Sequence, residues 1–375
     1  MANLAVRNLL HDKLRTAMTV AGVAFAVTLV FVQIGLFLGL LDNASVTIDR
    51  IDADLWVTSK NTPNIDFAHG FRETLVQRVR SVPGVERADN LLLQFLNLAL
   101  PNGAEESMLV YGLEDFSRWG IPWAIEAGDV ADLRRGDFMF LDGSAERRMG
   151  PFSVGDYREV MGYRLKIIGR TREALSFTTS PIAFLDYRLV QRLAGERMDG
   201  RTTYILVKAA PAADLEAIRA EIARRLPYND VYTSAEWAKR SRNYWVASTG
   251  LGLNMYITVF LGCLVGVVVV AQTLYTSTME HLKEFGTVKA IGGSNLDIYR
   301  ILGVQAAVAA VVGFLLGGAL SAALGAPMAR IGLKLIIPAP LGAAVFAGTL
   351  VFCLAAAFVS FRKVASIDPA LVFRA

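Results

Sequence analysis

Four long stretches of the chain contain no Asp, Glu, Lys or Arg; they are residues 16–41, 243–279, 301–329 and 335–361. A helix needs about 20 mainly apolar residues to cross the hydrocarbon core of a bilayer, so each stretch is long enough. The second is too long for one span, and its beginning, Asn243–Gly250, is polar and aromatic, which is typical of the membrane interface. The pattern therefore predicts an integral membrane protein with four transmembrane α-helices, at residues 16–41, 251–276, 301–325 and 336–361.

The start of the chain has a different pattern. Residues 4–14 place several apolar side chains on one side of a helix, which predicts a short interfacial helix before the first span. The apolar run of the first span is longer than the roughly 7–15 residues of a cleaved signal peptide. We therefore expect residues 1–41 to form this interfacial helix and an uncleaved first transmembrane helix.

Residues 42–242, between the first two spans, show shorter patterns that indicate a mixed α+β domain. Apolar runs bounded by Gly, Pro or Asn predict strands at Asp54–Thr58, Val85–Leu100, Ser107–Tyr111, Tyr204–Lys208 and Asp230–Thr233, with several more between residues 136 and 193. Apolar residues three or four apart predict helices at Phe71–Ser81 and Ala212–Leu226. The segment is long enough for its own core. We expect two lobes, with the later strand–helix–strand packing on the earlier part.

The distribution of Lys and Arg predicts the orientation, because these residues are enriched in cytoplasmic segments near span ends. With the N-terminus inside, the cytoplasmic segments hold Arg7, Lys13, Arg15, Lys283, Lys289, Arg300, Arg362, Lys363 and Arg374. The short outer loop holds only Arg330 and Lys334. Both termini and residues 277–299 are therefore expected in the cytoplasm, and residues 42–242 outside it. Residues 243–375 form the last block, with three spans and the loop between the second and third spans.

Composition and missing motifs narrow the function. The chain is 54% hydrophobic with a mean hydropathy of +0.41. Its net charge of +4 reflects basic residues beside the spans, so we expect no nucleic acid partner. The spans hold no ionisable Asp, Glu, Lys, Arg or His, which disfavours an ion-coupled carrier. No phosphate-binding loop, nucleophile elbow or zinc-protease motif is present, and the three histidines lack metal-ligand spacing. We expect no catalytic, cofactor or metal site, and neither Cys263 nor Cys353 lies in the outer domain.

Pairs of glycines four residues apart occur in three spans; they are Gly35/Gly39, Gly262/Gly266 and Gly313/Gly317. Such pairs share a helix face and let two helix backbones approach closely. In the third span this small face continues through Ser321. We expect these residues to contact another helix, either within the chain or in a second copy.

The loop between the second and third spans predicts an amphipathic helix at residues 279–291. Apolar residues recur every three positions, and Gly292 and Gly293 end the pattern. Glu280 and Lys283 can pair across one turn. Such a helix suits the lipid headgroups and a groove on another protein equally well.

The same loop carries a resemblance to a known family. Met279–Ser294 is similar to the segment "E…REIG-hydrophobic-KAIGAS" of FtsX/MacB-type ABC transporter permeases, and the order of one span, a large outer domain and three spans matches as well. Leu10–Thr16, Gly22–Ala26, Phe31–Gly35 and Asp54–Val57 resemble the DevC-like branch most closely.

The resemblance implies a non-catalytic permease subunit of an efflux complex in a bacterial inner membrane, with the outer domain in the periplasm. Such permeases act as homodimers, and each copy binds a separate ATPase, which carries the ATP and Mg. The contact with the ATPase would involve Glu280, Leu282, Lys283, Glu284, Phe285, Val288, Ile291, Gly292 and Gly293. Because no room for a fused ATPase precedes Thr16, we expect it in trans.

Further partners follow from the same resemblance. They are a periplasmic membrane-fusion adaptor, an outer-membrane channel and membrane lipids. ATP-driven closure of the ATPase would pass through the first two spans to the outer domain by mechanotransmission. Two alternatives stay open: an FtsX-like signalling protein that controls a periplasmic hydrolase, and a permease that releases lipoproteins.

Overall fold

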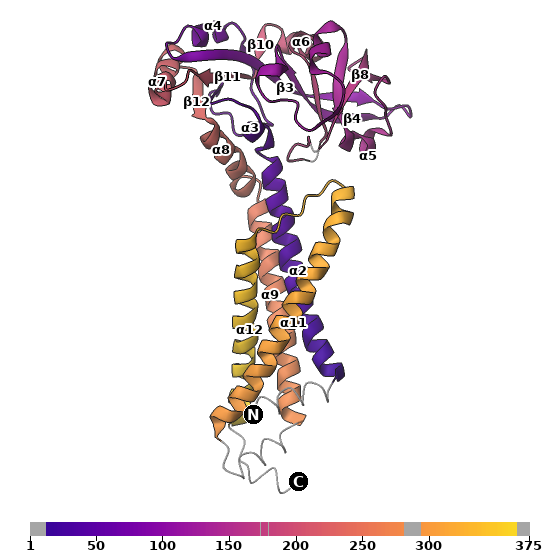
Figure 1. Cartoon of the computed structure of the whole chain (residues 1–375), viewed down its shortest axis with the longest axis vertical. Helices are drawn as coiled ribbons and strands as arrows, with labels where there is room; N and C mark the ends of the chain where they lie inside the picture. Colours follow the sequence, from indigo (N-terminus) through magenta and orange to yellow (C-terminus); the bar gives the residue numbers. More distant parts are fainter. Residues whose placement is uncertain (1–12, 173, 179, 281–293, 366–375) are drawn as a thin grey trace. The chain divides into compact units, whose positions relative to one another are not determined.

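The structure is a computed structural model that describes residues 13–172, 174–178, 180–280 and 294–365 (Figure 1). It divides into two compact units. Residues 40–252 form one, called here the outer domain. The segments on either side of it form the other, called here the membrane unit.

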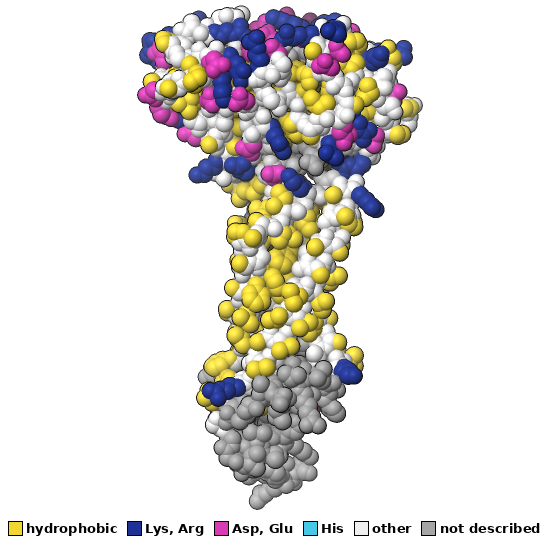
Figure 2. All heavy atoms as spheres, viewed as in Figure 1, with side chains coloured by type: hydrophobic (Ala, Val, Ile, Leu, Met, Phe, Trp, Pro, Cys, Tyr) yellow, Lys and Arg dark blue, Asp and Glu magenta, His cyan; other side chains and the backbone are white. Residues whose placement is uncertain are grey.

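The described part of the membrane unit is built on four long helices; they are α2 (Lys13–Asn43), α9 (Leu251–Glu280), α11 (Asn295–Arg330) and α12 (Ala339–Ala365). Each contains a stretch long and apolar enough to cross a membrane, with hydropathy values between 2.2 and 2.4. Figure 2 shows hydrophobic side chains over the visible face of these helices, whereas charged side chains gather on the outer domain. The predicted class, four membrane helices with a mixed α and β domain between the first and second, is confirmed.

The fourth helix begins a few residues later than the apolar pattern suggests. The carbonyl of Pro338 accepts hydrogen bonds from the amides of Leu341 and Gly342, at 3.0 and 3.2 Å, so the first helical turn starts there. Proline fits this position because its missing N–H would have no partner in a first turn. Ile336 and Ile337 therefore precede the helix instead of lying within it.

The outer domain is built on one ten-stranded mixed sheet. Its strands are β1 (Leu55–Ser59), β3 (Val85–Ala99), β4 (Glu105–Leu113), β5 (Ile125–Ala127), β6 (Phe138–Asp142), β7 (Tyr157–Val160), β8 (Tyr163–Thr171), β9 (Ile182–Asp186), β11 (Tyr204–Ala209) and β12 (Asn229–Thr233). Their order is β12-β1-β11-β3-β4-β9-β6-β8-β5, and β7 pairs with β3 and β8. The two lobes that we expected are thus the two ends of one sheet, which the long strands β3 and β4 join.

Helices cover both faces of this sheet; they are α3 (Val46–Arg50), α4 (Leu75–Arg80), α5 (Glu146–Met149), α6 (Tyr187–Ala194), α7 (Leu215–Arg225) and α8 (Ser234–Ala247). In Figure 1, α3 and α8 lie on one side of the domain and α4, α6 and α7 on the other. The sequence of β3 reflects this cover. Leu91 and Leu93 pack with the cluster that contains Trp237 of α8, whereas Leu92 packs with residues of α6. Because both faces are buried at Leu91–Leu93, these three consecutive positions are apolar, whereas burial alternates from Phe95 to Leu98.

One helix is shorter than predicted. We expected a helix over Phe71–Ser81, but Phe71 and Arg72 form strand β2, which pairs with β10 (Arg201–Thr202). The helix α4 begins only at Leu75. The backbone pairing with a segment about 130 residues later in the chain overrides the local helical spacing, which is a tertiary effect that periodicity does not contain.

Candidate functional site

The first span takes part in the buried cluster of the membrane unit. Val23, Val27 and Phe31 of α2 share one buried cluster with Ile301 and Ala306 of α11. The rings of Phe31 and Phe314 meet edge to face, with centroids 5.8 Å apart. Movement of α2 therefore has to displace side chains of its neighbour, because packed cores resist continuous deformation.

The glycine pair of α9 lies against α2. A Cβ atom added at Gly262 would overlap the side chain of Leu29, and one added at Gly266 would lie 2.6 Å from the Cβ of Ala26. Neither added Cβ atom could therefore be accommodated without a shift of the neighbouring side chain or helix. The two glycines therefore let the backbones of α9 and α2 approach closely, as small residues do in membrane helices.

The small face of α11 also lies against α2. A Cβ atom at Gly313 would lie 2.6 Å from the Cβ of Val23, and one at Gly317 would lie 2.7 Å from the carbonyl oxygen of Ala24. The hydroxyl of Thr28 donates to the carbonyls of Ala24 and Gly317, at 2.7 and 3.2 Å, and so links the two helices.

The remaining residues of the predicted packing set are also accounted for within the chain. The buried hydroxyl of Ser321 donates to the Gly317 carbonyl at 2.8 Å. Gly35 accepts a hydrogen bond from the amide of Ile336 at 3.1 Å, and Gly39 lies against Lys334. The six glycines thus lie against other segments of their own chain, whereas the Ser321 hydroxyl bonds within its own helix.

Most of the residues predicted to contact an ATPase lie outside the described residues; they are Leu282, Lys283, Glu284, Phe285, Val288, Ile291, Gly292 and Gly293. Glu280 is described as the last residue of α9, and its side chain is exposed. The predicted interfacial helix before α2 also lies outside the described residues up to residue 12.

The beginning and the end of the outer domain are joined by side chains. Arg242 of α8 donates to the hydroxyl of Ser45 and lies 3.4 Å from a carboxylate oxygen of Asp49 on α3. Nearby, the rings of Phe177 and Trp245 stack with centroids 3.8 Å apart. We call these five residues the basal clasp. The basal clasp therefore ties the first helix of the domain to the last.

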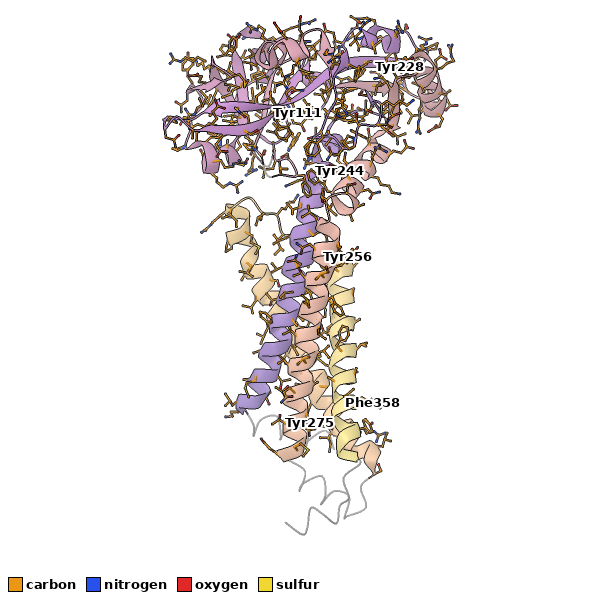
Figure 3. All side chains as sticks on the ribbon, turned by 180° about the vertical axis from the view of Figure 1, so that it is seen from behind. Tyr111, Tyr228, Tyr244, Tyr256, Tyr275 and Phe358 are labelled. Carbon is orange, nitrogen blue, oxygen red and sulfur yellow. The ribbon has the colours of Figure 1, made fainter. Side chains whose placement is uncertain are left out.

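The basal clasp continues into the loop between β1 and β2, residues 60–70. Phe67 of this loop contacts the rings of Tyr244 and Trp245, with centroids 6.0 and 5.8 Å apart; Tyr244 is labelled in Figure 3. The amide of Ile65 donates to the hydroxyl of Ser241 at 3.1 Å. The loop is therefore fastened along α8 by polar and aromatic contacts.

A buried carboxyl lies in the same loop. Asp66 is 7% exposed, and its Oδ2 atom has no hydrogen-bond partner among the described residues. Burial raises the pKa of Asp66 to about 7, because a charge is costly away from water. Burial raises the pKa of Tyr111 and that of Tyr204, and a charge on the nearby Asp66 raises both further. A charge on Asp66 would thus be buried within the part of the domain that is fastened to α8.

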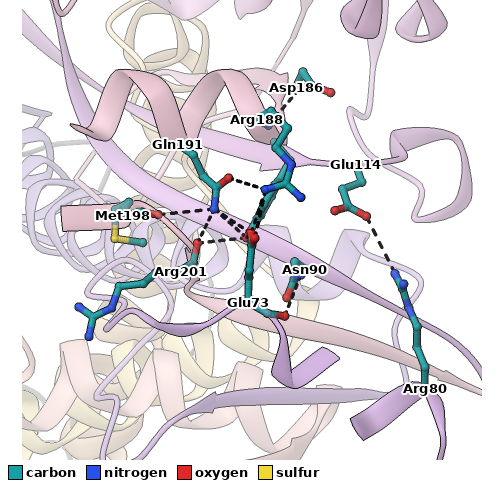
Figure 4. Close-up of polar contacts among 10 residues, drawn as sticks. Glu73, Arg80, Asn90, Glu114, Asp186, Arg188, Gln191, Met198 and Arg201 are labelled. Atoms are coloured by element: carbon teal, nitrogen blue, oxygen red, sulfur yellow. Dashed lines mark hydrogen bonds and ion pairs between the residues drawn. The ribbon is translucent and has the colours of Figure 1, made fainter. Parts of the chain in front are cut away.

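A polar network fastens the opposite side of the outer domain (Figure 4). Glu73 accepts hydrogen bonds from Tyr187, Arg188 and Gln191 of α6, at 3.0, 3.1 and 2.8 Å. Burial alone would raise the pKa of Glu73, but the hydrogen bonds from Gln191, Arg188 and Tyr187 together lower it. The ionised carboxylate therefore holds the segment before α4 against α6 at neutral pH.

Helix α8 is not among the helices that we predicted, although its residues Ser241, Arg242, Tyr244 and Trp245 make the contacts described above. Its start has a clear signal: Thr233 and Glu236 form a capping box, in which each side chain binds the backbone of the other. Trp245, which we expected at the membrane interface, is buried against Phe177 within the outer domain. A search for the pattern Thr-x-x-Glu would have found the helix.

The fold and these contacts define the class: a membrane protein whose large α/β domain is inserted after the first of its four spanning helices. Residues 16–225 match the family described as MacB-like periplasmic core domain, and residues 256–369 match the FtsX-like permease C-terminal family. The chain belongs to the FtsX/MacB-type permeases of ABC transporters. A permease of this kind works with an ATPase partner.

The chain is also similar to relatives and to a solved structure. An uncharacterized ABC transporter permease of Mycobacterium tuberculosis strain H37Rv is 25% identical over 385 residues, covering 98% of each chain. An uncharacterized ABC transporter permease of Mycobacterium bovis is 26% identical over 366 residues, covering 96% of this chain and 95% of the relative. The periplasmic region of MacB from Actinobacillus actinomycetemcomitans is similar with a TM-score of 0.40 and 12% identity, covering 50% of this chain and 92% of that structure.

Proposed function

We propose that the chain is the membrane subunit of an ABC-type efflux complex and transmits movement, driven by a separate ATPase, to its outer domain. The basal clasp is the observation that carries this proposal. It ties Ser45 and Asp49, which follow the first span, to Arg242, which precedes the second. A force on either span is then delivered to one connected body instead of to two loose ends.

The packing of the membrane unit favours transmission of movement over passage of a substrate between its spans. Its buried cluster is apolar, and the small residues pack α2 tightly against α9 and α11. In this proposal the substrate is handled outside the membrane, and the outer domain works with a periplasmic adaptor and an outer-membrane channel. ATP and Mg are bound by the ATPase. The chain acts as a homodimer in a bacterial inner membrane, through surfaces other than the glycine faces.

The ATPase contact is tested by shortening one side chain. In the proposed contact, Phe285 inserts into a groove of the ATPase, and Lys283 lies at the rim. Truncating a buried aromatic anchor to Ala costs about 2 kcal/mol or more, which is roughly a thirtyfold loss of affinity. Phe285→Ala is therefore expected to release the ATPase from the purified complex and to abolish stimulated ATP hydrolysis.

Lys283→Ala is the matched control, because an exposed ion pair contributes only about 0–1 kcal/mol. It is expected to weaken ATPase binding slightly and to reduce its dependence on salt. Membrane insertion should be normal in both variants. Full ATPase binding and hydrolysis by Phe285→Ala would assign the segment to the lipid surface and contradict the proposed coupling.

The orientation is tested by labelling. Asn102 lies in the exposed turn between β3 and β4, and Ser294 is an exposed residue before α11. After Cys263 and Cys353 are replaced by Ala, Asn102→Cys should react with a membrane-impermeant maleimide on spheroplasts, and Ser294→Cys should react only after lysis. The reverse pattern would mean that the outer domain faces the cytoplasm.

A further inference from the structure

A cavity of about 260 Å³ lies between α2, α9 and α12, within the membrane unit. Val27 of α2, Val270 of α9 and Cys353 of α12 are among the residues that line it. Of the lining residues that the structure describes, Thr349 is the one with a hydroxyl group, which donates to the carbonyl of Val345 at 2.7 Å. Along this wall, every side chain therefore presents an apolar surface or an already satisfied hydroxyl.

The cavity is elongated along the helices. Its lining runs from Val23 to Ile34 on α2 and from Leu341 to Cys353 on α12. At 1.5 Å per residue, each of these segments covers roughly 17 Å of helix axis. This is more than half of the hydrocarbon core, which is about 30 Å thick. Because the helices cross the membrane, a linear chain in the cavity would run in the same direction as the lipid tails.

Gly348 of α12 keeps part of this space open. Among the described residues outside its own helical turn, no atom lies within 4 Å of a Cβ atom added there. One added at Gly266, which also lines the cavity, would lie 2.6 Å from Ala26. Glycine in a helix interior is less favourable than alanine by about 1 kcal/mol. At Gly266 the small residue permits helix contact. At Gly348 none of the described residues occupies this space.

We propose that this cavity binds the acyl chain of a bilayer lipid. Water does not suit it, because apolar cavities of about 150 Å³ stay dry and take up small hydrocarbons. An empty space would deprive the lining of dispersion contacts. Within a membrane the hydrocarbon at hand is the lipid tail, and an elongated apolar wall matches its shape. The lipid chain would thereby lie between the first span and the last, both of which line the cavity.

Photolabelling of the intact chain tests the proposal, and no ATPase is needed. The protein is reconstituted into vesicles of phosphatidylethanolamine and phosphatidylglycerol that include phosphatidylethanolamine with a diazirine in its acyl chain. After irradiation, adducts are located by mass spectrometry. We expect adducts on Val27, Val270 or Cys353, each only 3% exposed, as well as on Phe358, which is 51% exposed and is labelled in Figure 3.

Two glycine variants separate cavity labelling from general contact with lipid. Gly348→Leu fills the cavity and should reduce adducts on the three buried residues at least tenfold, with Phe358 unaffected. Gly342→Leu adds the same side chain to open space on the same helix, outside the lining. It should change neither the adducts on the three buried residues nor those on Phe358.

Adducts confined to Phe358 in the unmodified chain would overturn the proposal, and so would full labelling of the buried residues in Gly348→Leu. Disulfide-linked dimers of a Gly348→Cys variant, with no adducts on the buried residues, would also overturn it, because they would assign the cavity to a second copy. The photolabelling experiment involves neither ATP nor an adaptor. A result that overturns lipid binding in the cavity would therefore not contradict the proposed coupling to an ATPase.

Discussion

Replacing Asp66 with Asn is expected to stabilise the outer domain at pH 8 and to remove a pH dependence of its unfolding. In the unfolded chain this carboxyl has a pKa of 3.8, whereas burial raises its pKa in the folded domain to about 7. Between pH 3.8 and about 7, the folded domain therefore binds one more proton than the unfolded chain does. The stability from this group is fully present below pH 3.8 and is lost as the pH rises through about 7.

The effect is large because each pKa unit corresponds to about 1.4 kcal/mol, so the upper limit is about 4 kcal/mol. The amide of Asn has nearly the same shape as the carboxyl and does not ionise. Unfolding can be followed by tryptophan fluorescence, since all five tryptophans lie in the outer domain. Asp199→Asn, the same change at an exposed site, should leave the pH profile unchanged. An identical profile for Asp66→Asn and the unmodified chain would refute the prediction.

Gly317→Ala is expected to destabilise the membrane unit, whereas Gly318→Ala should not. The new methyl group at Gly317 would lie 2.7 Å from the carbonyl oxygen of Ala24 and 2.8 Å from the Cβ of Val27, so α2 and α11 must separate. Overpacking of this kind costs about 1–3 kcal/mol. At Gly318 the nearest atom outside the helix is 3.9 Å away, in Phe31, which is an ordinary contact.

The chain provides its own reporter for this comparison. Both cysteines, Cys263 and Cys353, lie in the membrane unit, so a thiol-reactive dye detects its thermal opening while tryptophan fluorescence follows the outer domain. Gly317→Ala should lower the temperature of dye labelling and leave the fluorescence transition in place. Equal labelling temperatures for the two variants would mean that α2 and α11 are not packed as described.

The parts of the fold that could be predicted are those that depend on local patterns. The four spans follow from the absence of charge over long runs, and strands such as β3, β4 and β11 follow from apolar runs bounded by turns. The turn at Pro101–Gly103 lies between β3 and β4 as the sequence indicates. These features depend on neighbouring residues, so one sequence contains them.

The parts that could not be predicted depend on contacts between distant segments. The glycine pairs indicate close packing, but nothing in their spacing says that α9 and α11 both use them against α2. Asp66 lies in a polar loop that reads as exposed, and it becomes buried because α8 packs on that loop from about 175 residues away. The β2 strand likewise exists only through its pairing with β10.

The hydrogen bond between Ser45 and Arg242 also has a meaning for the history of such proteins. Domains whose ends lie close together tolerate transfer into other chains, because the recipient needs only a narrow opening. With its entrance and exit side by side, residues 45–242 can be exchanged for another domain without respacing the helices that flank them. The same four spanning helices could then carry a different outer domain after exchange at two junctions, one near residue 45 and one near residue 242.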